Sequence, residues 1–442
     1  MPLDEMNRTV AVVGLGKIGL PLAAQFAGKG LDVIGCDVLP EVVDAINAGR
    51  SHIHEEAGLE EAVAAAVKTR RLKATTETAA AAASAEVVVI IVPLLVDMTR
   101  RIDYRNIDAA TMAVGRGIHQ GSLVICETTL PVGTTRQRLA PILERESGLR
   151  AGVDFHLAFS PERLYAGRIF EDLRKYPKVV GGINEASTRR AVEFYRSVLD
   201  AEVWAVDNTE TAEFTKLAET TYRDVNIALA NQFALYAASR DVNVRQAFKA
   251  ANSQPFSHIH VPSFGVGGHC IPVYPEFMLG DATDGELSLV RDGRRTNDHM
   301  AAVGIRQLER ALGGLSGKNV LVLGASYRED VKELAFSTAY PIVEELQRAG
   351  TRVAIHDPLF TAAELRGLDA EVVALDSAEA RAAEAIVVQA WHRNFNGLGW
   401  RDFPRLRAIV DARGKLDGDS IRSAGLAYIA IGAPEARTGV PN

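Results

Sequence analysis

The chain has 442 residues, of which 47% are hydrophobic and 24% are charged, and its formal net charge is −7. This composition is typical of a globular protein with more than one domain, and the acidic balance argues against a general binder of nucleic acids or membrane surfaces. Its three cysteines are too few and too scattered for a disulfide framework or a thiolate metal site. Met1–Thr9 shows no secretory signal, so we expect a cytoplasmic protein. No carboxylate or thiol completes a ligand set with the histidine pairs at 52–54 and 258–260, so we expect no bound metal.

A nucleotide-binding pattern opens the chain. The apolar run Thr9–Val13 predicts a buried strand, and residues 20–29 predict the helix that follows it. The glycine-rich turn between them permits a pyrophosphate to approach the backbone at the helix N-terminus. A second predicted strand, over 32–36, ends at Asp37, where a carboxylate can bind the ribose hydroxyls of NAD. The sequence therefore predicts an NAD site made of Gly14, Gly16, Lys17, Ile18, Gly19 and Asp37.

Two further strand ends belong to the same predicted sheet edge. The strand over 86–92 ends at Pro93, and the strand over 123–126 runs into Thr128 and Thr129. Strand ends on this side of a doubly wound sheet face the cofactor. The two threonines either bind a ligand there or cap the helix predicted over 136–144.

Glu162 follows another predicted strand, over 155–159, within the run Ser160-Pro161-Glu162-Arg163. A carboxylate after a buried strand can act as a general base. It can equally be a charge at the N-terminus of the next helix. Both interpretations stay open from the residues alone.

The middle of the chain predicts one long helix without proline, over 208–251, with apolar residues at helical spacing. Such a helix suits a hub between domains and a dimer seam. Lys216 lies among its apolar residues. This lysine either stabilises negative charge in a transition state or reaches from the helix to solvent.

Cys270 stands in the glycine-rich loop Gly265-Val266-Gly267-Gly268-His269-Cys270-Ile271-Pro272. Glycines let the backbone approach a ligand closely, and a thiol becomes a nucleophile when its thiolate is favoured. From the loop alone, Cys270 is either such a nucleophile or an inert small residue.

After the glycines at 313–317 the βα pattern restarts without a second glycine fingerprint, so this part is expected to bind something other than a second dinucleotide. We therefore expect an α/β protein with two Rossmann-like doubly wound domains joined by a long central helix. The expected boundaries are 1–206 for the NAD-binding domain, 207–312 for the central helical dimerisation region with the cysteine loop, and 313–442 for the C-terminal Rossmann-like domain.

The ordered motifs carry a family resemblance. They are the glycine turn at 14–21, Glu127–Thr135, residues 160–163, the run around Lys216 and the cysteine loop. The chain resembles the nucleoside-diphosphate-sugar 6-dehydrogenases of the UDP-glucose/GDP-mannose dehydrogenase superfamily. The amino-acid sequences of the cysteine loop and of residues 223–231 are most similar to those of the branch acting on UDP-N-acetylglucosamine and UDP-N-acetylmannosamine.

The resemblance implies that the C6 alcohol of a UDP-sugar is oxidised to the carboxylate with NAD, through a cysteine thiohemiacetal and thioester. It implies a nucleotide-sugar substrate, a homodimer or higher homo-oligomer, a role in polysaccharide or secondary-metabolite biosynthesis, and no nucleic-acid or membrane partner. The implied catalytic residues are Cys270, Lys216, Glu162 and Thr129, and Pro93 and Thr129 join the cofactor-binding residues. The implied substrate-binding residues are Glu162, Arg163, Leu164, Lys216, Asn226, Gly265, Gly267 and Arg328.

Several positions depart from the family pattern, including Leu94 and Leu95 after Pro93, and four of them bear most directly on the implied activity. Thr220 replaces an expected asparagine, Tyr274 an expected aspartate and Arg328 an expected lysine, while Ala335 stands where an arginine is expected. The missing aspartate is the family's partner of the lysine in proton handling. The alternatives are a member that stops at the aldehyde or oxidises another alcohol, and a non-catalytic binder of NAD or a nucleotide sugar.

Overall fold

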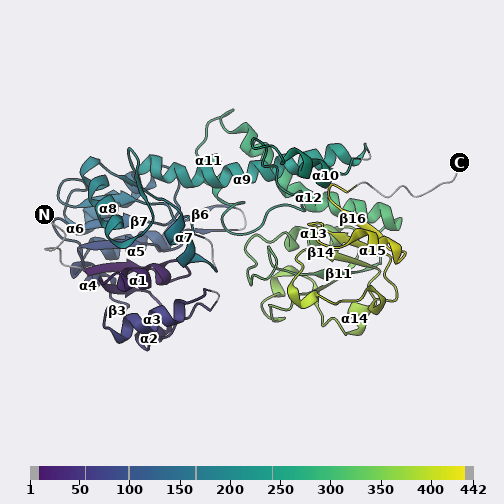
Figure 1. Ribbon diagram of the computed structural model, residues 1–442, viewed down its shortest axis with the longest axis horizontal. Helices are drawn as coiled ribbons and strands as arrows, with labels where there is room; N and C mark the ends of the chain where they lie inside the picture. Colours follow the sequence, from purple (N-terminus) through teal and green to yellow (C-terminus); the bar gives the residue numbers. More distant parts are fainter. Residues whose placement is uncertain (1–8, 55, 98–99, 165–166, 241, 434–442) are drawn as a thin grey trace. The chain divides into compact units, whose positions relative to one another are not determined.

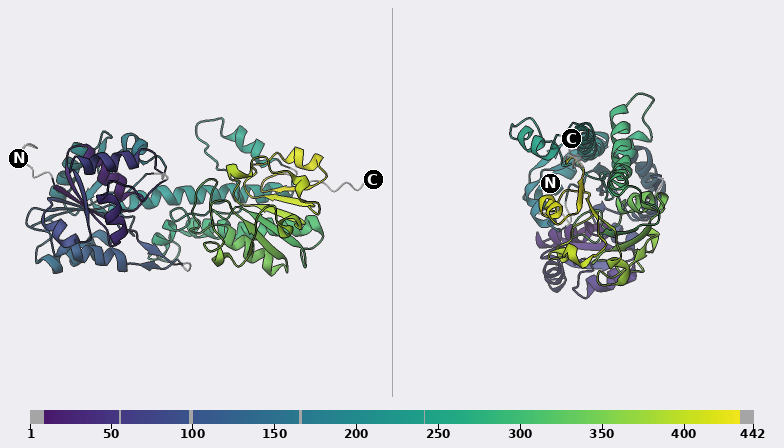
Figure 2. Two further views of the ribbon diagram at one scale, coloured as in Figure 1. Left: turned by 90° about the horizontal axis from the view of Figure 1, so that it is seen from below. Right: turned by 90° about the vertical axis from the view of Figure 1, so that its right-hand side faces the viewer.

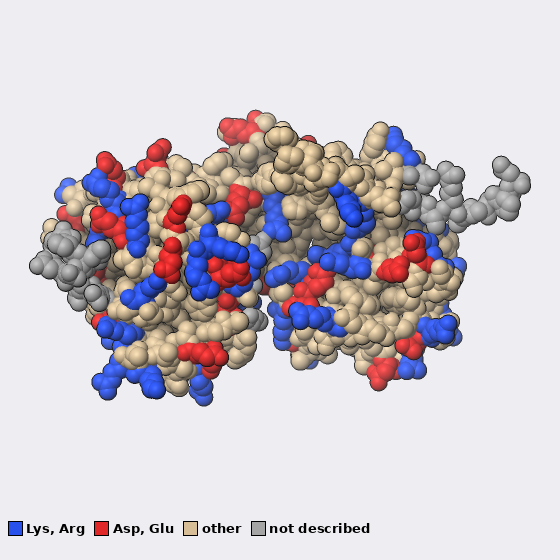
Figure 3. Space-filling view, viewed as in Figure 1, with Lys and Arg blue, Asp and Glu red and all other residues tan. Residues whose placement is uncertain are grey.

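The computed structural model describes residues 9–433 except 55, 98–99, 165–166 and 241. The chain divides into two compact units, Met1–Glu219 and Thr220–Asn442. Each unit contains one large sheet with helices around it (Figure 1). Among the described residues, no helix is both long and apolar enough to cross a bilayer. Positive and negative side chains are interspersed on the surface shown in Figure 3.

The first unit is built on an eight-stranded sheet of order β10-β9-β8-β7-β4-β1-β2-β3. Its strands are β1 (Thr9–Val13), β2 (Asp32–Cys36), β3 (Leu72–Thr75), β4 (Val87–Ile90), β7 (Leu123–Cys126), β8 (His156–Phe159), β9 (Lys178–Gly182) and β10 (Val203–Ala205). From β3 to β8 all neighbours are parallel, and β9 runs antiparallel to β8. The order β3-β2-β1-β4-β7-β8 is that of a dinucleotide-binding fold. The short strands β5 (Leu95–Val96) and β6 (Ile102–Asp103) form a separate antiparallel pair.

Both faces of this sheet are covered, as its sequence requires. Val10 and Val12 pack into one hydrophobic cluster, whereas Ala11 and Val13 pack into another. Successive side chains of a strand point to opposite faces, so a continuous apolar run indicates a strand buried on both. The helices of the unit are α1 (Gly19–Gly28), α2 (Pro40–Asn47), α3 (Leu59–Lys68), α4 (Thr78–Ala83), α5 (Arg105–Gly115), the π-helix η2 (Thr135–Leu139), α6 (Ala140–Ser147), α7 (Ile169–Lys175) and α8 (Glu185–Val198).

The second unit contains a six-stranded, all-parallel sheet of order β13-β12-β11-β14-β15-β16. Its strands are β11 (Asn319–Leu323), β12 (Arg352–His356), β13 (Glu371–Val372), β14 (Ala385–Val388), β15 (Ala408–Asp411) and β16 (Ala427–Ala430). The order repeats that of the first sheet, so both expected Rossmann-like folds are present. The helices are α10 (Val244–Ala251), α11 (Tyr274–Leu279), α12 (Ser288–Leu312), α13 (Ala339–Arg348), α14 (Ala378–Arg381) and α15 (Gly418–Ser423), with short 3₁₀ turns η3 (Arg366–Leu368), η4 (Arg393–Phe395) and η5 (Trp400–Asp402).

The long central helix is shorter than the sequence predicts. Helix α9 covers Thr209–Ala238 without interruption (Figure 2), and a separate helix, α10, begins at Val244. The prediction of one helix over 208–251 was therefore wrong in its last part. Asn243 explains the new start, because its side chain accepts a hydrogen bond from the backbone N–H of Gln246 at 3.2 Å and so caps α10.

A buried ion pair fastens the second-unit part of α9 to α12. Arg294 lies 2.5 Å from a carboxylate oxygen of Asp224, and both side chains are buried. Asn297 donates a hydrogen bond to the same carboxylate at 2.9 Å, and its amide oxygen accepts one from the side-chain amide of Asn231 at 3.0 Å. These contacts hold α9 against α12, the helices that lie on either side of the cysteine loop in the chain.

Candidate active site

The glycine turn of the first unit has the geometry that a pyrophosphate needs. Gly14 has φ +96°, and a Cβ there would lie 2.8 Å from the carbonyl oxygen of Ile91. A Cβ on Gly19 would lie 1.8 Å from the carbonyl oxygen of Gly14, so the turn closes tightly onto α1. By contrast, Gly16 is exposed and faces open space. The backbone is therefore accessible to a phosphate at the helix N-terminus, and the residues fit NAD.

Asp37 lies beside this turn, as the sequence predicts. One of its carboxylate oxygens accepts a hydrogen bond from the backbone N–H of Leu15 at 3.0 Å, and the other accepts one from Leu39 at 3.1 Å. These bonds fix the carboxylate at the end of β2, next to the glycine turn. Pro93 lies at the neighbouring strand end and is exposed.

Replacing Gly14 by valine should weaken NAD binding by at least about tenfold. A branched side chain disfavours the positive φ of this position, and its Cβ would clash with the carbonyl oxygen of Ile91. Isothermal titration calorimetry with NAD measures this. Gly28→Ala is the matched control, because a Cβ at Gly28 meets no atom within 4 Å. An unchanged dissociation constant for Gly14→Val would place the cofactor elsewhere.

The threonine loop after β7 is held from α9. Glu213 is buried, and its carboxylate accepts hydrogen bonds from the backbone N–H of Gly133 at 2.5 Å and of Thr135 at 2.8 Å. Burial raises the pKa of Glu213 to about 7, although these bonds oppose the rise. Thr129 is buried in the loop. The following helix begins at Thr135, so the interpretation of Thr128 and Thr129 as its cap was wrong.

Lys216 is half-buried on α9, one helical turn after Glu213. Because Glu213 is tied to the loop of Thr129, this turn of α9 has a fixed position within the first unit. A lysine held in this way can present its ammonium group to a developing negative charge.

Glu162 is held by both of its carboxylate oxygens. One accepts hydrogen bonds from the backbone N–H groups of Arg163 at 2.6 Å and Leu164 at 2.9 Å. The other lies 3.2 Å from the ammonium nitrogen of Lys178. The next helix, α7, begins only at Ile169, so the interpretation of Glu162 as its N-terminal charge was wrong.

Sequence reasoning missed the groups behind Glu162. The Nζ atom of Lys178 also lies 2.7 Å from a carboxylate oxygen of Glu127, and the hydroxyl of Tyr195 donates a hydrogen bond to the other oxygen. Burial raises the pKa of Glu127 to about 7, and Lys178 opposes the rise. Burial alone would lower the pKa of Lys178, but the two carboxylates raise it above its usual value. The only local signal was that Glu127 and Lys178 stand at strand ends.

In the second unit, the cysteine loop packs on the loop after β11. A Cβ at Gly267 would lie 2.7 Å from Cβ of Tyr327, and Gly268 donates a backbone hydrogen bond to the carbonyl oxygen of Ala335 at 2.8 Å. The glycines are therefore needed for the close approach of two backbones. Although Ala335 lacks the expected arginine side chain, its carbonyl oxygen still anchors this loop.

Cys270 has polar groups around its sulfur. Its Sγ lies 3.7 Å from the hydroxyl oxygen of Tyr274, the residue that replaces the expected aspartate. His269 lies 3.4 Å from a carboxylate oxygen of Glu333, and hydrogen bonds with Cys270 and Glu333 raise the pKa of His269 to about 10. A protonated imidazole and a phenol next to the sulfur both favour the thiolate.

The other two thiols differ from Cys270 in exposure. Cys36 and Cys126 are buried, whereas Cys270 is partly exposed. Burial raises the pKa of Cys36 to about 12 and also raises the pKa of Cys126. Of the three cysteines, Cys270 is therefore the one whose thiol an external reagent can reach.

Arg328 lies on the loop that the cysteine loop contacts. Its Nε donates a hydrogen bond to the hydroxyl of Tyr327 at 3.0 Å. Arg413 donates another to the carbonyl oxygen of Tyr327. Two guanidinium groups therefore flank this tyrosine, and guanidinium groups suit a phosphate ligand.

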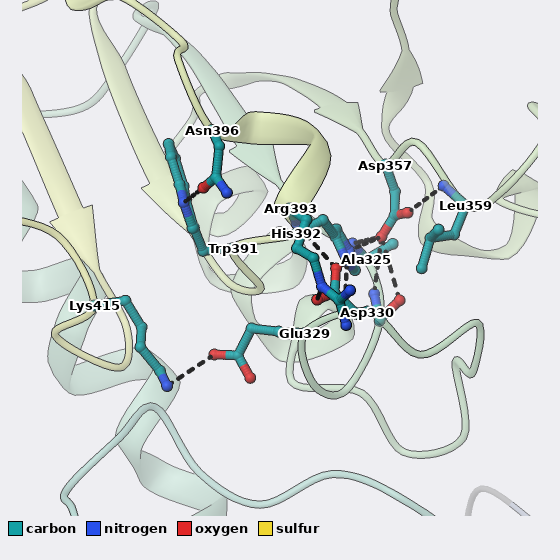
Figure 4. Close-up of polar contacts among 11 residues, drawn as sticks. Ala325, Glu329, Asp330, Asp357, Leu359, Trp391, His392, Arg393, Asn396 and Lys415 are labelled. Carbon is teal, nitrogen blue, oxygen red and sulfur yellow. Dashed lines mark hydrogen bonds and ion pairs between the residues drawn. The ribbon is translucent and has the colours of Figure 1, made fainter. Parts of the chain in front are cut away.

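Asp357 fixes the same loop from within (Figure 4). Its carboxylate accepts hydrogen bonds from the backbone N–H of Ala325 at 2.6 Å and from Nε2 of His392 at 3.0 Å. His392 can donate there because its Nδ1 accepts a hydrogen bond from the backbone N–H of Asp330 at 2.9 Å. Burial alone would raise the pKa of Asp357, but these hydrogen bonds and that from Leu359 hold it below its usual value. The pair thus positions residues 325–330, which include Arg328.

The predicted substrate residues differ in their surroundings. Gly265 has φ +123°, and a Cβ there would lie 2.7 Å from the carbonyl oxygen of Asn297. Asn226 donates a hydrogen bond to the hydroxyl of Tyr222 at 3.1 Å on the same helix. Thr220, which replaces the expected asparagine, is buried.

Three models of one family match the chain in order. They describe the NAD-binding domain of the UDP-glucose/GDP-mannose dehydrogenase family over residues 8–199, its central domain over 210–299 and its UDP-binding domain over 321–419. The UDP-N-acetyl-D-mannosamine dehydrogenase of Pyrococcus horikoshii is 36% identical over 91% of this chain and 95% of its own length. The chain belongs to this family. It is an NAD-dependent nucleotide-sugar dehydrogenase, as its motifs predict.

Other similar proteins agree with this membership. The UDP-N-acetyl-D-mannosamine dehydrogenase of Escherichia coli K12 is 32% identical to this dehydrogenase over 92% of the chain and 98% of its own length. The structure of the P. horikoshii protein has a TM-score of 0.86 at 34% identity, covering 97% of this chain and 100% of its own. An NDP-N-acetyl-D-galactosaminuronic acid dehydrogenase from Methanosarcina mazei Go1 has a TM-score of 0.87 at 30% identity, covering 98% and 96%.

Proposed function

We propose that this dehydrogenase oxidises the C6 alcohol of a UDP-N-acetylhexosamine to the carboxylate. The full-length similarity to UDP-N-acetyl-D-mannosamine dehydrogenases supports the substrate class. The observation that carries the proposal for the chemistry is the partly exposed Cys270 with His269 and Tyr274 beside its sulfur. The reaction consumes one alcohol, two NAD and one water, and it yields one carboxylate, two NADH and three protons.

The proposed roles are those that the family resemblance implies, and the contacts of Cys270 and Glu162 support two of them. The glycine turn and Asp37 would hold NAD, which would supply the hydride acceptor for both oxidations. The Cys270 thiolate adds to the C6 aldehyde, so that a C–S bond forms and the intermediate is not released. Lys216 stabilises the negative oxygen of the alkoxide and of the thiohemiacetal. Glu162 takes a proton from the water that attacks the thioester, Thr129 orients that water, and the C–S bond breaks to restore the thiolate.

The remaining site residues are proposed to bind the ligands. We assign Gly14, Gly16, Lys17, Ile18, Gly19, Asp37, Pro93 and Thr129 to NAD. We assign Arg163, Leu164, Asn226, Gly265, Gly267 and Arg328, together with Glu162 and Lys216, to the nucleotide sugar. The guanidinium group of Arg328 supports its assignment to the diphosphate.

The test is the stoichiometry of NADH on a panel of UDP-N-acetylglucosamine, UDP-N-acetylmannosamine and UDP-glucose. We expect two NADH per sugar with an N-acetylated substrate and a uronate product by mass spectrometry. One NADH per sugar with an aldehyde product would contradict the double oxidation. NAD binding without turnover of any sugar would contradict the enzymatic proposal.

Replacing Tyr274 by phenylalanine should slow alkylation of Cys270 by iodoacetamide about threefold to tenfold at neutral pH. The Cys270 thiol donates to the hydroxyl oxygen of Tyr274 at 3.7 Å, and the phenol can donate back once the sulfur is ionised, so its loss should lower the thiolate fraction. Peptide mass spectrometry measures the alkylation rate of this cysteine. Tyr222→Phe is the matched control, since Tyr222 is exposed on α9. Equal rates in both variants would remove Tyr274 from the mechanism.

We also propose that the enzyme is a cytoplasmic homodimer or higher homo-oligomer. Tyr222, Leu229, Phe233 and Tyr236 lie at helical spacing on α9 and are all exposed. A stripe of large apolar side chains on one helix face suits contact with a second copy. Multi-angle light scattering of the purified protein tests this, and a monomer at micromolar concentration would contradict it.

A further inference from the structure

The buried network behind Glu162 is more than one ion pair. Lys178 lies between Glu127, at 2.7 Å, and Glu162, at 3.2 Å, and Tyr195 donates to the far oxygen of Glu127. The four residues come from different parts of the first unit: Glu127 follows β7, Glu162 follows β8, Lys178 begins β9 and Tyr195 lies on α8. One continuous chain of contacts therefore joins Glu162 to the interior.

Access to solvent distinguishes the two carboxylates. The side chain of Glu127 is 0% exposed and that of Lys178 is 7% exposed, whereas that of Glu162 is 12% exposed. Glu162 is thus the end of the network that an external water molecule can reach. A single buried lysine shared by two carboxylates contributes little to stability, because desolvation offsets the attraction. This arrangement instead suits a group whose charge changes during a reaction.

We propose that Lys178 and Glu127 are positioning residues that orient Glu162 and compensate its change of charge during thioester hydrolysis. This inference rests on the proposed function. Backbone N–H groups hold one oxygen of Glu162 and Lys178 holds the other. When Glu162 takes a proton from the attacking water, it becomes neutral. Lys178 then keeps Glu127 as its anionic partner, so no buried ammonium is left unpaired.

Because the charge of Glu127 depends on pH, the inference predicts a pH dependence of thioester hydrolysis. The groups facing Glu127 are Lys178 on β9, Glu162 after β8 and Tyr195 on α8, and the thiol of Cys126 adjoins it on β7. Burial raises the pKa of Glu127 to about 7. Below this pH Glu127 is neutral, so Lys178 pairs with Glu162 alone and makes it a weaker base. Above this pH Lys178 is shared, so hydrolysis should become faster as the pH rises through about 7.

The experiment measures the amount of acyl-enzyme during turnover and the pH profile of its hydrolysis, by rapid quench and intact-protein mass spectrometry. Glu162→Gln serves as the reference that accumulates acyl-enzyme. We expect Lys178→Met to accumulate it as well, with hydrolysis about 100-fold slower, and Lys178→Arg to recover most of the rate. Lys175→Met is the matched control, because Lys175 is an exposed lysine paired with Glu171. Glu127→Gln should lose the rise in rate near pH 7.

The outcomes separate this inference from the proposed function. Absence of acyl-enzyme in every variant, Glu162→Gln included, would overturn the proposed covalent route and with it the inference. A second outcome would overturn only the role of the network. In it, Glu162→Gln accumulates acyl-enzyme, but the folded variants Lys178→Met and Glu127→Gln hydrolyse acyl-enzyme as fast as wild type at every pH. If Lys178→Met fails to fold, the near-isosteric Glu127→Gln decides: an unchanged pH profile overturns the inference, and a lost rise supports it.

Discussion

Replacing Cys270 by serine should abolish formation of the carboxylate, with a fall in the rate of the second oxidation of at least about 10³-fold. The thiolate is the group that retains the aldehyde and forms the acyl intermediate. A serine hydroxyl stays protonated at neutral pH and is a poor nucleophile without a dedicated base. The partners seen near Cys270, His269 and Tyr274, favour an anionic sulfur and would do little to ionise an alcohol.

Single-turnover kinetics with NADH absorbance and product mass spectrometry measure this effect. Cys36→Ala is the matched control, because it removes a buried thiol whose pKa is raised to about 12. We expect the control to keep two NADH per sugar. Carboxylate formation by Cys270→Ser at the wild-type rate would contradict a covalent intermediate at this position.

Lys216→Met should slow both oxidations by about 10² to 10³-fold, because it removes a positioned charge from an oxygen that becomes anionic in each step. The methionine keeps most of the length and apolar packing of the side chain on α9. Glu213 holds this turn of the helix independently through Gly133 and Thr135, so the fold should survive the change. Lys216→Arg should recover part of the rate, since the charge is kept while the geometry changes.

The readout that separates catalysis from structure is NAD affinity. We expect Lys216→Met to bind NAD as wild type does, and Lys249→Met on α10 to keep full activity as the control. A parallel loss of NAD binding and melting temperature would instead assign Lys216 a structural role.

The first β-α-β unit could be predicted closely from the sequence. Strands β1 and β2 have the expected bounds, because their apolar runs end at glycine and at Asp37. These signals are local: each depends on residues within a few positions of one another. The second series of β and α elements, which begins at β11, could be predicted equally well because its signals are also local.

The network behind Glu162 could not be predicted from the sequence, since its contacts join residues that are far apart in the chain. Glu127 lies 51 positions from Lys178 and 68 from Tyr195. No local pattern marks such a pair, and only the sheet, in which β9 runs antiparallel to β8, brings the start of β9 close to the end of β7. The break between α9 and α10 was missed because no proline or glycine marks it, and Asn243 alone signals the new start.

Cys270 illustrates an intermediate case. Its glycine loop was evident, and the replacement at Tyr274 was visible as a lost carboxylate. The position of the tyrosine hydroxyl follows from local structure: Tyr274 begins α11, and its backbone N–H donates to the carbonyl oxygen of Cys270 at 2.9 Å. This turn brings the phenol back toward the sulfur, which the identity of the residue alone does not reveal.

The most direct test of the covalent route is to isolate the intermediate. Glu162→Gln protein is mixed with NAD and a UDP-N-acetylhexosamine, quenched in acid, digested and analysed by peptide mass spectrometry. We predict an acyl adduct of the sugar on the peptide that contains Cys270, and none on the peptides that contain Cys36 or Cys126. Turnover to carboxylate with no adduct on Cys270 at any time would contradict the account.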